Sequence, residues 1–152
     1  MDATKPVYSA VYPDIESRLR LDEFMSTLPL IEPQKPEKLH ATTVYTKTPC
    51  PELYEYKYQL PVSAVPSGFK VFPGWKEGKT MQKVLVLVLE SPDLEKIWQD
   101  CMNMGATWSY PEFIPHISLG TVDENTALDF TVPTFQINFD RFTMEPVDKK
   151  AR

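Results

Sequence analysis

The stretch IPHISLG, residues 114–120, organises this 152-residue chain because a similar stretch, LHATTV at residues 39–44, lies upstream of it. The chain has only two histidines, and each stretch holds one of them. In both stretches a hydroxyl residue follows two positions after the histidine, which gives the pairs His40 with Thr42 and His116 with Ser118. β-Branched and apolar residues surround both pairs, a composition typical of β-strands.

Residues two apart in a strand project from the same face of a sheet. Each pair is therefore expected to present an imidazole beside a hydroxyl group. Two such pairs in one cleft supply two groups that exchange protons near neutral pH and two donors for anionic oxygens. This combination suits phosphodiester chemistry. A single histidine in a strand is more often structural, but two matched pairs favour a function.

The same order of elements is predicted twice. A strand at 7–12 precedes a helix from Asp14 to about Leu28, and a strand at 83–90 precedes a helix that begins after Ser91. Asp14 and Ser91 are residue types that cap helix N-termini, and apolar residues recur at helical spacing in both helices. A histidine strand then follows in each half.

The middle of the chain is less regular. Residues 54–61 and 69–72 are predicted as strands, and residues 73–79 as a loop because they are rich in glycine and charge. The segment 83–90, KVLVLVLE, is apolar on both faces, which predicts a central strand covered on each side. A final strand is expected at 135–144.

The repeated order predicts an α+β fold with two pseudo-symmetric lobes, each a small, mostly antiparallel sheet with a packed helix, facing each other across a central cleft. We expect one bilobal domain over residues 1–152, with the first lobe at about 1–75 and the second at about 80–147. The final strand is expected to complete the second lobe. The two histidine strands would lie side by side at the centre.

Composition narrows the range of partners. The net charge of −5 argues against long nucleic acid as the main ligand, since such binding needs many clustered Lys and Arg residues. No apolar run approaches the roughly 20 residues that span a bilayer, and the N-terminus lacks the layout of a signal peptide. We therefore expect no membrane partner and a cytoplasmic location, in the host cell if the protein is viral. The sequence does not reveal the oligomeric state, and a monomer is assumed.

The two cysteines, Cys50 and Cys101, have no CxxC spacing and are expected to be free thiols. A zinc site built from them together with His40 and His116 is conceivable, but the paired spacing of zinc ligands is missing. We expect neither a metal nor another cofactor.

The motifs HAT at 40–42 and HIS at 116–118 resemble those of the two-histidine (2H) phosphoesterase superfamily, and the duplicated order of elements extends this resemblance to the whole chain. The chain length, the N-terminal tyrosines, the tryptophan-containing segment 73–79 and the stretch PHISLG most resemble the phage anti-CBASS phosphodiesterases. Those enzymes degrade the cyclic oligonucleotide messengers of bacterial antiphage signalling. The resemblance implies a metal-independent phosphodiesterase that cleaves 3′–5′ bonds of cyclic di- and oligonucleotides, such as 3′3′-cyclic GMP-AMP, and so counteracts CBASS.

The residue types indicate a mechanism. One imidazole would take the proton from the attacking hydroxyl and the other would give a proton to the leaving oxygen, each role contributing about 10²- to 10⁴-fold in rate. Thr42 and Ser118 would hold the non-bridging phosphate oxygens. The sequence does not distinguish the base from the acid.

The resemblance also implies four substrate-binding residues: Tyr8, Tyr12, Trp75 and Glu145. A tyrosine of the first strand would stack on a base, and Glu145 would accept a hydrogen bond from a base edge. Trp75 would stack on a nucleobase, as aromatic residues do in single-stranded nucleic acid sites. The alternative for Trp75 is a structural role, packing its loop onto the core.

Two other functions remain open. A 2H enzyme that opens 2′,3′-cyclic phosphates at RNA ends would use the same four residues, but would be expected to carry a basic face. A non-catalytic nucleotide-binding accessory protein would need no matched pair of proton-transfer groups.

Overall fold

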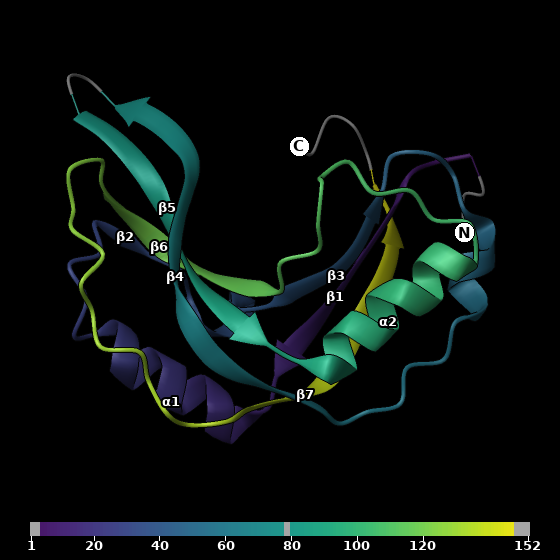
Figure 1. The fold of residues 1–152 in the computed structure, drawn as a ribbon, viewed down its shortest axis with the longest axis horizontal. Coiled ribbons are helices and arrows are strands. Elements are labelled where there is room, and N and C mark those ends of the chain that lie inside the picture. Colours follow the sequence, from purple (N-terminus) through teal and green to yellow (C-terminus); the bar gives the residue numbers. More distant parts are fainter. Residues whose placement is uncertain (1–3, 78–79, 148–152) are drawn as a thin grey trace.

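The computed structural model describes residues 4–77 and 80–147 (Figure 1). It is an α+β fold with one seven-stranded antiparallel sheet in the order β2-β6-β3-β1-β7-β4-β5, and a further pairing of β6 with β5 closes a ring of strands. The elements are β1 (Val7–Pro13), α1 (Ile15–Met25), β2 (Glu32–Pro33), the 3-10 helix η1 (Pro36–Lys38), β3 (Ala41–Thr46), the 3-10 helix η2 (Pro51–Glu55), β4 (Val62–Glu77), β5 (Thr80–Glu90), α2 (Pro92–Asn103), β6 (His116–Asp123) and β7 (Ile137–Pro146).

Both helices begin where the sequence predicts. Asp14 caps α1 by accepting a hydrogen bond from the backbone N–H of Ser17 at 2.8 Å. Ser91 caps α2 by accepting from the backbone N–H of Leu94 at 3.0 Å. These side chains satisfy N–H groups that have no partner within the helix.

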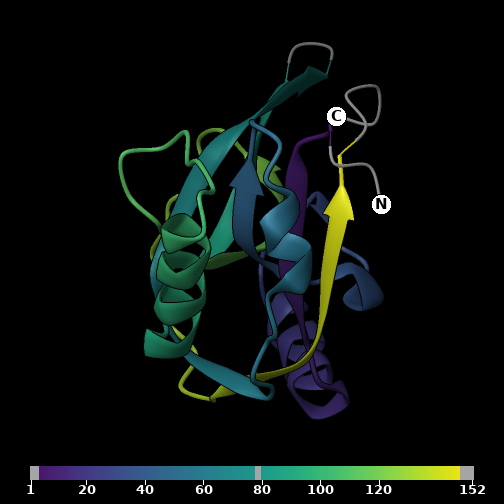
Figure 2. The same cartoon turned by 90° about the vertical axis from the view of Figure 1, so that its right-hand side faces the viewer.

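The sheet consists of two wings that meet at its centre. In the first wing β1 lies between β3 and β7, and in the second wing β5 lies between β6 and β4. The pairings of β3 with β6 and of β4 with β7 join the wings. Figures 1 and 2 show α2 packed beside the first wing and α1 below the sheet, where Phe24 of α1 stacks on Phe69 of β4 with ring centres 6.0 Å apart.

The sequence analysis expected the two lobes to divide at about residue 75. The wings of the structure do not divide there. The final strand, β7, pairs with β1 in the first wing, and β4 pairs along most of its length with β5 in the second. Consecutive antiparallel strands such as β4 and β5 readily form a hairpin. This leaves the outer edge of β1 to be paired by β7, which also protects that edge from other chains.

The middle of the chain differs from its prediction in two places. Residues 54–61 form no strand, because the 3-10 helix η2 and an extended connection occupy them. Tyr58, one of the tyrosines that alternate in this segment, instead attaches it to the sheet, because its hydroxyl hydrogen-bonds with Ser9 and Thr43. Residues 73–77, expected in a loop, continue β4, while residues 78–79 lie outside the described part.

Gly74 explains why the segment 73–77 resembles a loop in sequence. The β4–β5 register shifts between Phe72 and Trp75, as in a β-bulge. A Cβ atom at position 74 would lie 2.2 Å from the backbone oxygen of Gln82, so the close approach of the strands requires glycine there. Gly74 and the preceding Pro73 therefore mark an irregularity within a strand and not a loop.

The face of the sheet opposite the histidine motifs forms the core. Its fully buried side chains include Val11, Ala41, Val44, Leu87, Ile117, Leu119 and Phe139. Among the residues that the structure describes, no helix is both long and apolar enough to cross a membrane.

Gly120, the last residue of the IPHISLG stretch, allows β2 to pair closely with β6. Its φ angle is +150°, and an added Cβ would lie 2.5 Å from the backbone oxygen of Glu32. We predict that Gly120→Ala lowers the free energy of unfolding by about 1–3 kcal/mol, through backbone strain and this clash. Urea denaturation measures the change. Gly68→Ala is the matched control, since nothing lies within 4 Å of its added Cβ; equal losses in both variants would contradict the prediction.

Candidate active site

The register of β3 and β6 brings the two histidine motifs together. Ala41 lies opposite Ile117, and both are fully buried. Their neighbours in each strand therefore face the other side of the sheet. Continuing the antiparallel register by one residue in each direction gives two cross-strand pairs: His40 with Ser118, and Thr42 with His116. All four residues are partly exposed.

The predicted meeting of the two motifs at the centre of the sheet is thus confirmed. The cross-strand pairs add a feature that the sequence analysis did not contain, because each histidine lies opposite the hydroxyl residue of the other motif. The two imidazoles occupy one diagonal of a four-residue square, and the two hydroxyls occupy the other diagonal.

Both imidazoles are held in the same way. Nδ1 of His40 lies 2.8 Å from the carbonyl oxygen of Lys38, and Nδ1 of His116 lies 2.7 Å from that of Ile114. A carbonyl oxygen only accepts hydrogen bonds, so Nδ1 carries the hydrogen in both rings. In the neutral ring, Nε2 then keeps its lone pair for proton exchange. The acceptor lies two residues upstream of each histidine, so the repeated motif itself sets both orientations.

The surroundings of His116 favour its neutral form. Burial lowers the pKa of His116 below its ordinary value of 6.5, and the charge of His40 lowers it further, while the hydrogen bond to Ile114 opposes the shift. The ring of Phe72 packs edge-on against His116, with ring centres 4.9 Å apart. The register of β3 and β6 places the two imidazoles on neighbouring strands and on the same face, where both can act on one ligand.

Both tyrosines expected from β1 lie beside His40. The ring centre of Tyr8 is 6.3 Å from that of His40, and the ring centre of Tyr12 is 5.9 Å from it. The hydroxyl of Tyr8 also lies 3.0 Å from Oγ1 of Thr42, so it helps to orient that side chain. The structure therefore does not favour either tyrosine as the one expected to stack on a base.

The other two expected substrate-binding residues lie farther out. Glu145 is exposed and pairs with Tyr8 in the β1–β7 register, one strand farther from the histidines than Tyr8. Trp75 pairs through its backbone with Gln82 in the β4–β5 hairpin, and its side chain lies outside the part that the structure describes.

Two further residues at the site were missed by sequence reasoning. Phe72 contacts His116, and the guanidinium carbon of Arg141 lies 5.5 Å from the centre of the Tyr12 ring. Neither residue belongs to a motif. Only the pairing of β4 with β5 and of β7 with β1 brings them to the site, so no local signal could have identified them.

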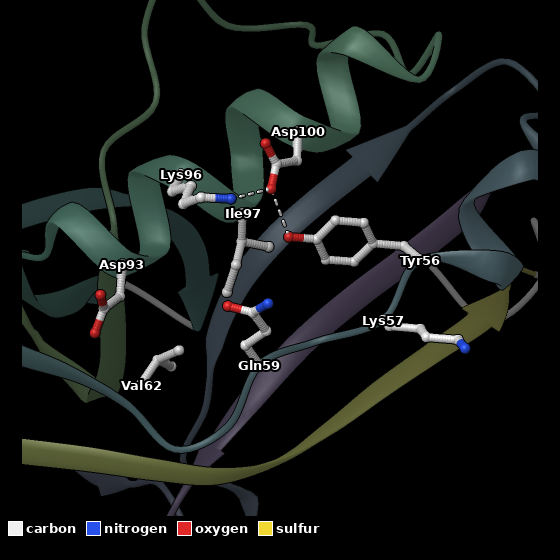
Figure 3. Close-up of a pocket in the computed structure, with 8 residues that line it drawn as sticks. All are labelled: Tyr56, Lys57, Gln59, Val62, Asp93, Lys96, Ile97 and Asp100. Carbon is white, nitrogen blue, oxygen red and sulfur yellow. Dashed lines mark hydrogen bonds and ion pairs between the residues drawn. The ribbon is translucent and has the colours of Figure 1, made fainter.

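A separate hollow of about 130 Å³ lies between α2 and the segment 56–62 (Figure 3). It is lined by Tyr56, Lys57, Gln59, Val62, Asp93, Lys96, Ile97 and Asp100. Tyr58 within that segment bonds to Ser9 and Thr43, which alternate with the residues that face the histidines. The hollow is therefore on the opposite, helix-covered face of the sheet. Tyr56 and Lys96 both donate to the same carboxylate, Asp100, so these polar groups satisfy one another.

The conceivable zinc site does not assemble. Cys50 and Cys101 are buried free thiols in the hydrophobic core, and the Cys50 Sγ lies 3.7 Å from the carbonyl oxygen of Met104. Within residues 4–77 and 80–147, no three His, Cys, Asp or Glu side chains are grouped so that they could hold a metal ion.

Solved structures share this fold. A Thermus thermophilus protein, TT0787, has a TM-score of 0.62 at 19% identity, and the match covers 91% of this chain and 86% of that protein. E. coli LigT, in its complex with NADP+, has a TM-score of 0.60 at 17% identity, covering 93% of this chain and 86% of LigT. The architecture is therefore that of the LigT-like 2H phosphoesterases.

Relatives in sequence are phage proteins. An anti-CBASS protein Acb1 of Vibrio phage KVP40 is 27% identical over 127 residues, covering 80% of this chain and 76% of the relative. One of Acinetobacter phage Ac42 is 27% identical over 118 residues, covering 78% of this chain and 74% of the relative. The family described as Anti-CBASS protein Acb1 matches residues 5–152 of this chain. Because that match spans nearly the whole sequence, the chain belongs to the Acb1 family of anti-CBASS proteins.

Proposed function

We propose that this chain is a metal-independent phosphodiesterase that cleaves 3′–5′ bonds of cyclic di- and oligonucleotides, such as 3′3′-cyclic GMP-AMP, and thereby counteracts CBASS signalling. One observation carries the proposal: two imidazoles, each with Nδ1 fixed by a backbone carbonyl, alternate with two hydroxyl residues on one face of adjoining strands. Membership of the anti-CBASS family supports the biological role. LigT structures with NADP+ and with ATP support a nucleotide as ligand.

The diagonal arrangement fits the geometry of the reaction. The attacking and leaving oxygens of a phosphoryl centre lie roughly in line on opposite sides of the phosphorus. A phosphate bound over the four-residue square would have one imidazole at each end of this line. The hydroxyls of Thr42 and Ser118, on the other diagonal, would donate to the non-bridging oxygens and stabilise charge in the transition state.

The environments of the imidazoles suggest their roles. The lowered pKa of His116 keeps it mostly neutral at pH 7, so it would act as the base that takes the proton from the attacking hydroxyl. His40 would then give a proton to the leaving oxygen through Nε2. The imidazole base performs the activation that a metal-bound hydroxide performs in metalloenzymes, so the proposal includes no metal. Because the relatives are phage proteins, the proposed place of action is the cytoplasm of the host cell.

The two histidines can be tested by substitution. His40→Ala and His116→Ala should each lower kcat/KM for 3′3′-cyclic GMP-AMP by at least about 10²-fold, because each removes one proton-transfer group. Thr42→Ala and Ser118→Ala should lower it less. Chromatography of the products measures cleavage, in the presence of excess EDTA.

The control for these variants is Thr134→Ala, which removes an exposed hydroxyl in the connection between β6 and β7, outside both motifs. Circular dichroism establishes whether each variant is folded. Wild-type activity in a folded histidine variant would contradict the two-histidine mechanism. Loss of wild-type activity in EDTA, with recovery on adding a divalent metal, would contradict metal independence.

The pH dependence follows from the lowered pKa of His116. The acid limb of the pH profile of kcat/KM should have its midpoint below pH 6.5, because a base must be neutral and the pKa of His116 in the folded protein lies below that value. In the folded His40→Asn variant, NMR titration should show the pKa of His116 moving upward, since the nearby charge has been removed. A midpoint of the acid limb above pH 6.5, or an unchanged pKa of His116 in that variant, would contradict the assignment of His116 as the base.

A further inference from the structure

One row of side chains crosses six strands on the face that carries the histidines. The β1–β3 and β3–β6 registers, each continued by one residue, place His40 between Tyr12 and Ser118. The other registers then extend the row on both sides. Its members are, in order, Arg141, Tyr12, His40, Ser118, Val86 and Lys70. The histidine and the hydroxyl residue occupy its centre. A cation ends the row on each side, Arg141 in the first wing and Lys70 in the second.

Contacts on both faces of β7 establish the direction of Arg141. The next residue, Phe142, stacks on Tyr58 with ring centres 4.1 Å apart, on the helix-covered face. Arg141 therefore points to the histidine face, where its guanidinium carbon is 5.5 Å from the centre of the Tyr12 ring. The Tyr12 ring centre is in turn 5.9 Å from that of His40. An arginine over an aromatic ring is held by a cation–π attraction, which orients its planar donor group.

Arg141 is not committed to a strong ion pair. Its Nε lies 3.8 Å from an oxygen of Asp140, and the two side chains are 59% and 52% exposed. Exposed pairs of this kind contribute little, so an anionic ligand can replace the aspartate. Two strand spacings, on the order of 10 Å, separate the backbones of β7 and β3. Arg141 is thus placed for a charged group beyond the phosphate that lies between the histidines.

We propose that Arg141 binds the second, uncleaved phosphate of a cyclic dinucleotide while the first phosphate lies over the histidines. The inference rests on the proposed function and deepens it. A guanidinium can donate two parallel hydrogen bonds to a phosphate, which a lysine cannot. Arg141 is favoured over Lys70 because the Tyr12 ring orients it, whereas the neighbour of Lys70 in the row is Val86. The site then selects ligands with two phosphates over linear dinucleotides with one.

The test compares two substrates that contain the same type of 3′–5′ bond. One is 3′3′-cyclic GMP-AMP, with two phosphates, and the other is the linear dinucleotide GpA, with one. Arg141→Gln should raise KM for the cyclic substrate by about 10-fold or more, the effect of losing a charge-assisted hydrogen bond. It should leave kcat for the cyclic substrate and KM for GpA nearly unchanged. Arg141→Lys should lie between wild type and Arg141→Gln.

Arg20→Gln is the matched control, since it makes the same substitution at an exposed arginine of α1 that pairs with Glu16. It should change neither KM. The KM for the cyclic substrate should also depend less steeply on salt in Arg141→Gln, because one phosphate contact is lost. Equal losses for both substrates, no loss for either, or a selective loss in Lys70→Gln instead would overturn the role of Arg141.

Calorimetric binding of the same two ligands separates this inference from the proposed function. If the wild type binds the cyclic dinucleotide but cleaves neither ligand, the proposed function fails, and the binding affinities of the Arg141 variants still test the inference. If the wild type cleaves the cyclic dinucleotide and Arg141→Gln binds it as tightly as the wild type, only the inference fails. Absence of any binding to the wild type overturns both.

Discussion

The pairing of Ala41 with Ile117 joins the two wings of the sheet, and the candidate site depends on it. Both apolar side chains are fully buried in the core, so the residues next to them in each strand must face the opposite side of the sheet. A slip of one residue in this register would turn over the strand that slips, sending its histidine into the core and its buried partner residue, Ala41 or Ile117, to the surface. The free energy of burying the apolar side chains therefore also fixes the positions of the imidazoles and hydroxyls.

The neighbouring strands hold this central pair in place. β1 and β5 flank it, and both bring aromatic or apolar side chains to the same face as the histidines. Tyr8 reaches Thr42, and Phe72 on the neighbouring β4 reaches His116. The two wings differ in these contacts although their strand order is equivalent. Such differences give the two imidazoles separate environments, so a pseudo-symmetric sheet can provide one base and one acid.

The predictable part of this structure is the part encoded locally. The helix caps at Asp14 and Ser91 and the two histidine strands each follow from a few neighbouring residues, and the repeat of their order predicted the meeting of His40 and His116. The position of β7 did not follow, because pairing with β1 depends on residues far away in the chain. The length of β4 was missed since Gly74 serves a bulge rather than a turn.

The candidate site shows the same limit. Motif spacing predicted the four residues that β3 and β6 bring together, and the resemblance to anti-CBASS phosphodiesterases directed attention to the tyrosines of β1. Arg141 and Phe72 carry no sequence signal, because their proximity to the histidines arises from strand register alone. Strand register is set by packing along the whole sheet, so these residues become visible only in the folded chain.

Nε2 must be the proton-exchanging atom of both imidazoles if the carbonyls of Lys38 and Ile114 hold Nδ1–H. Long-range proton–nitrogen correlation spectra of histidine-labelled protein report the tautomer directly, at about pH 8.5, well above the ordinary histidine pKa. The chain has two histidines, so the His40→Ala variant assigns both signals. Both rings should be in the Nδ1–H form, with a lone pair on Nε2. A predominant Nε2–H form in either ring would contradict the proposed pair of proton-transfer groups.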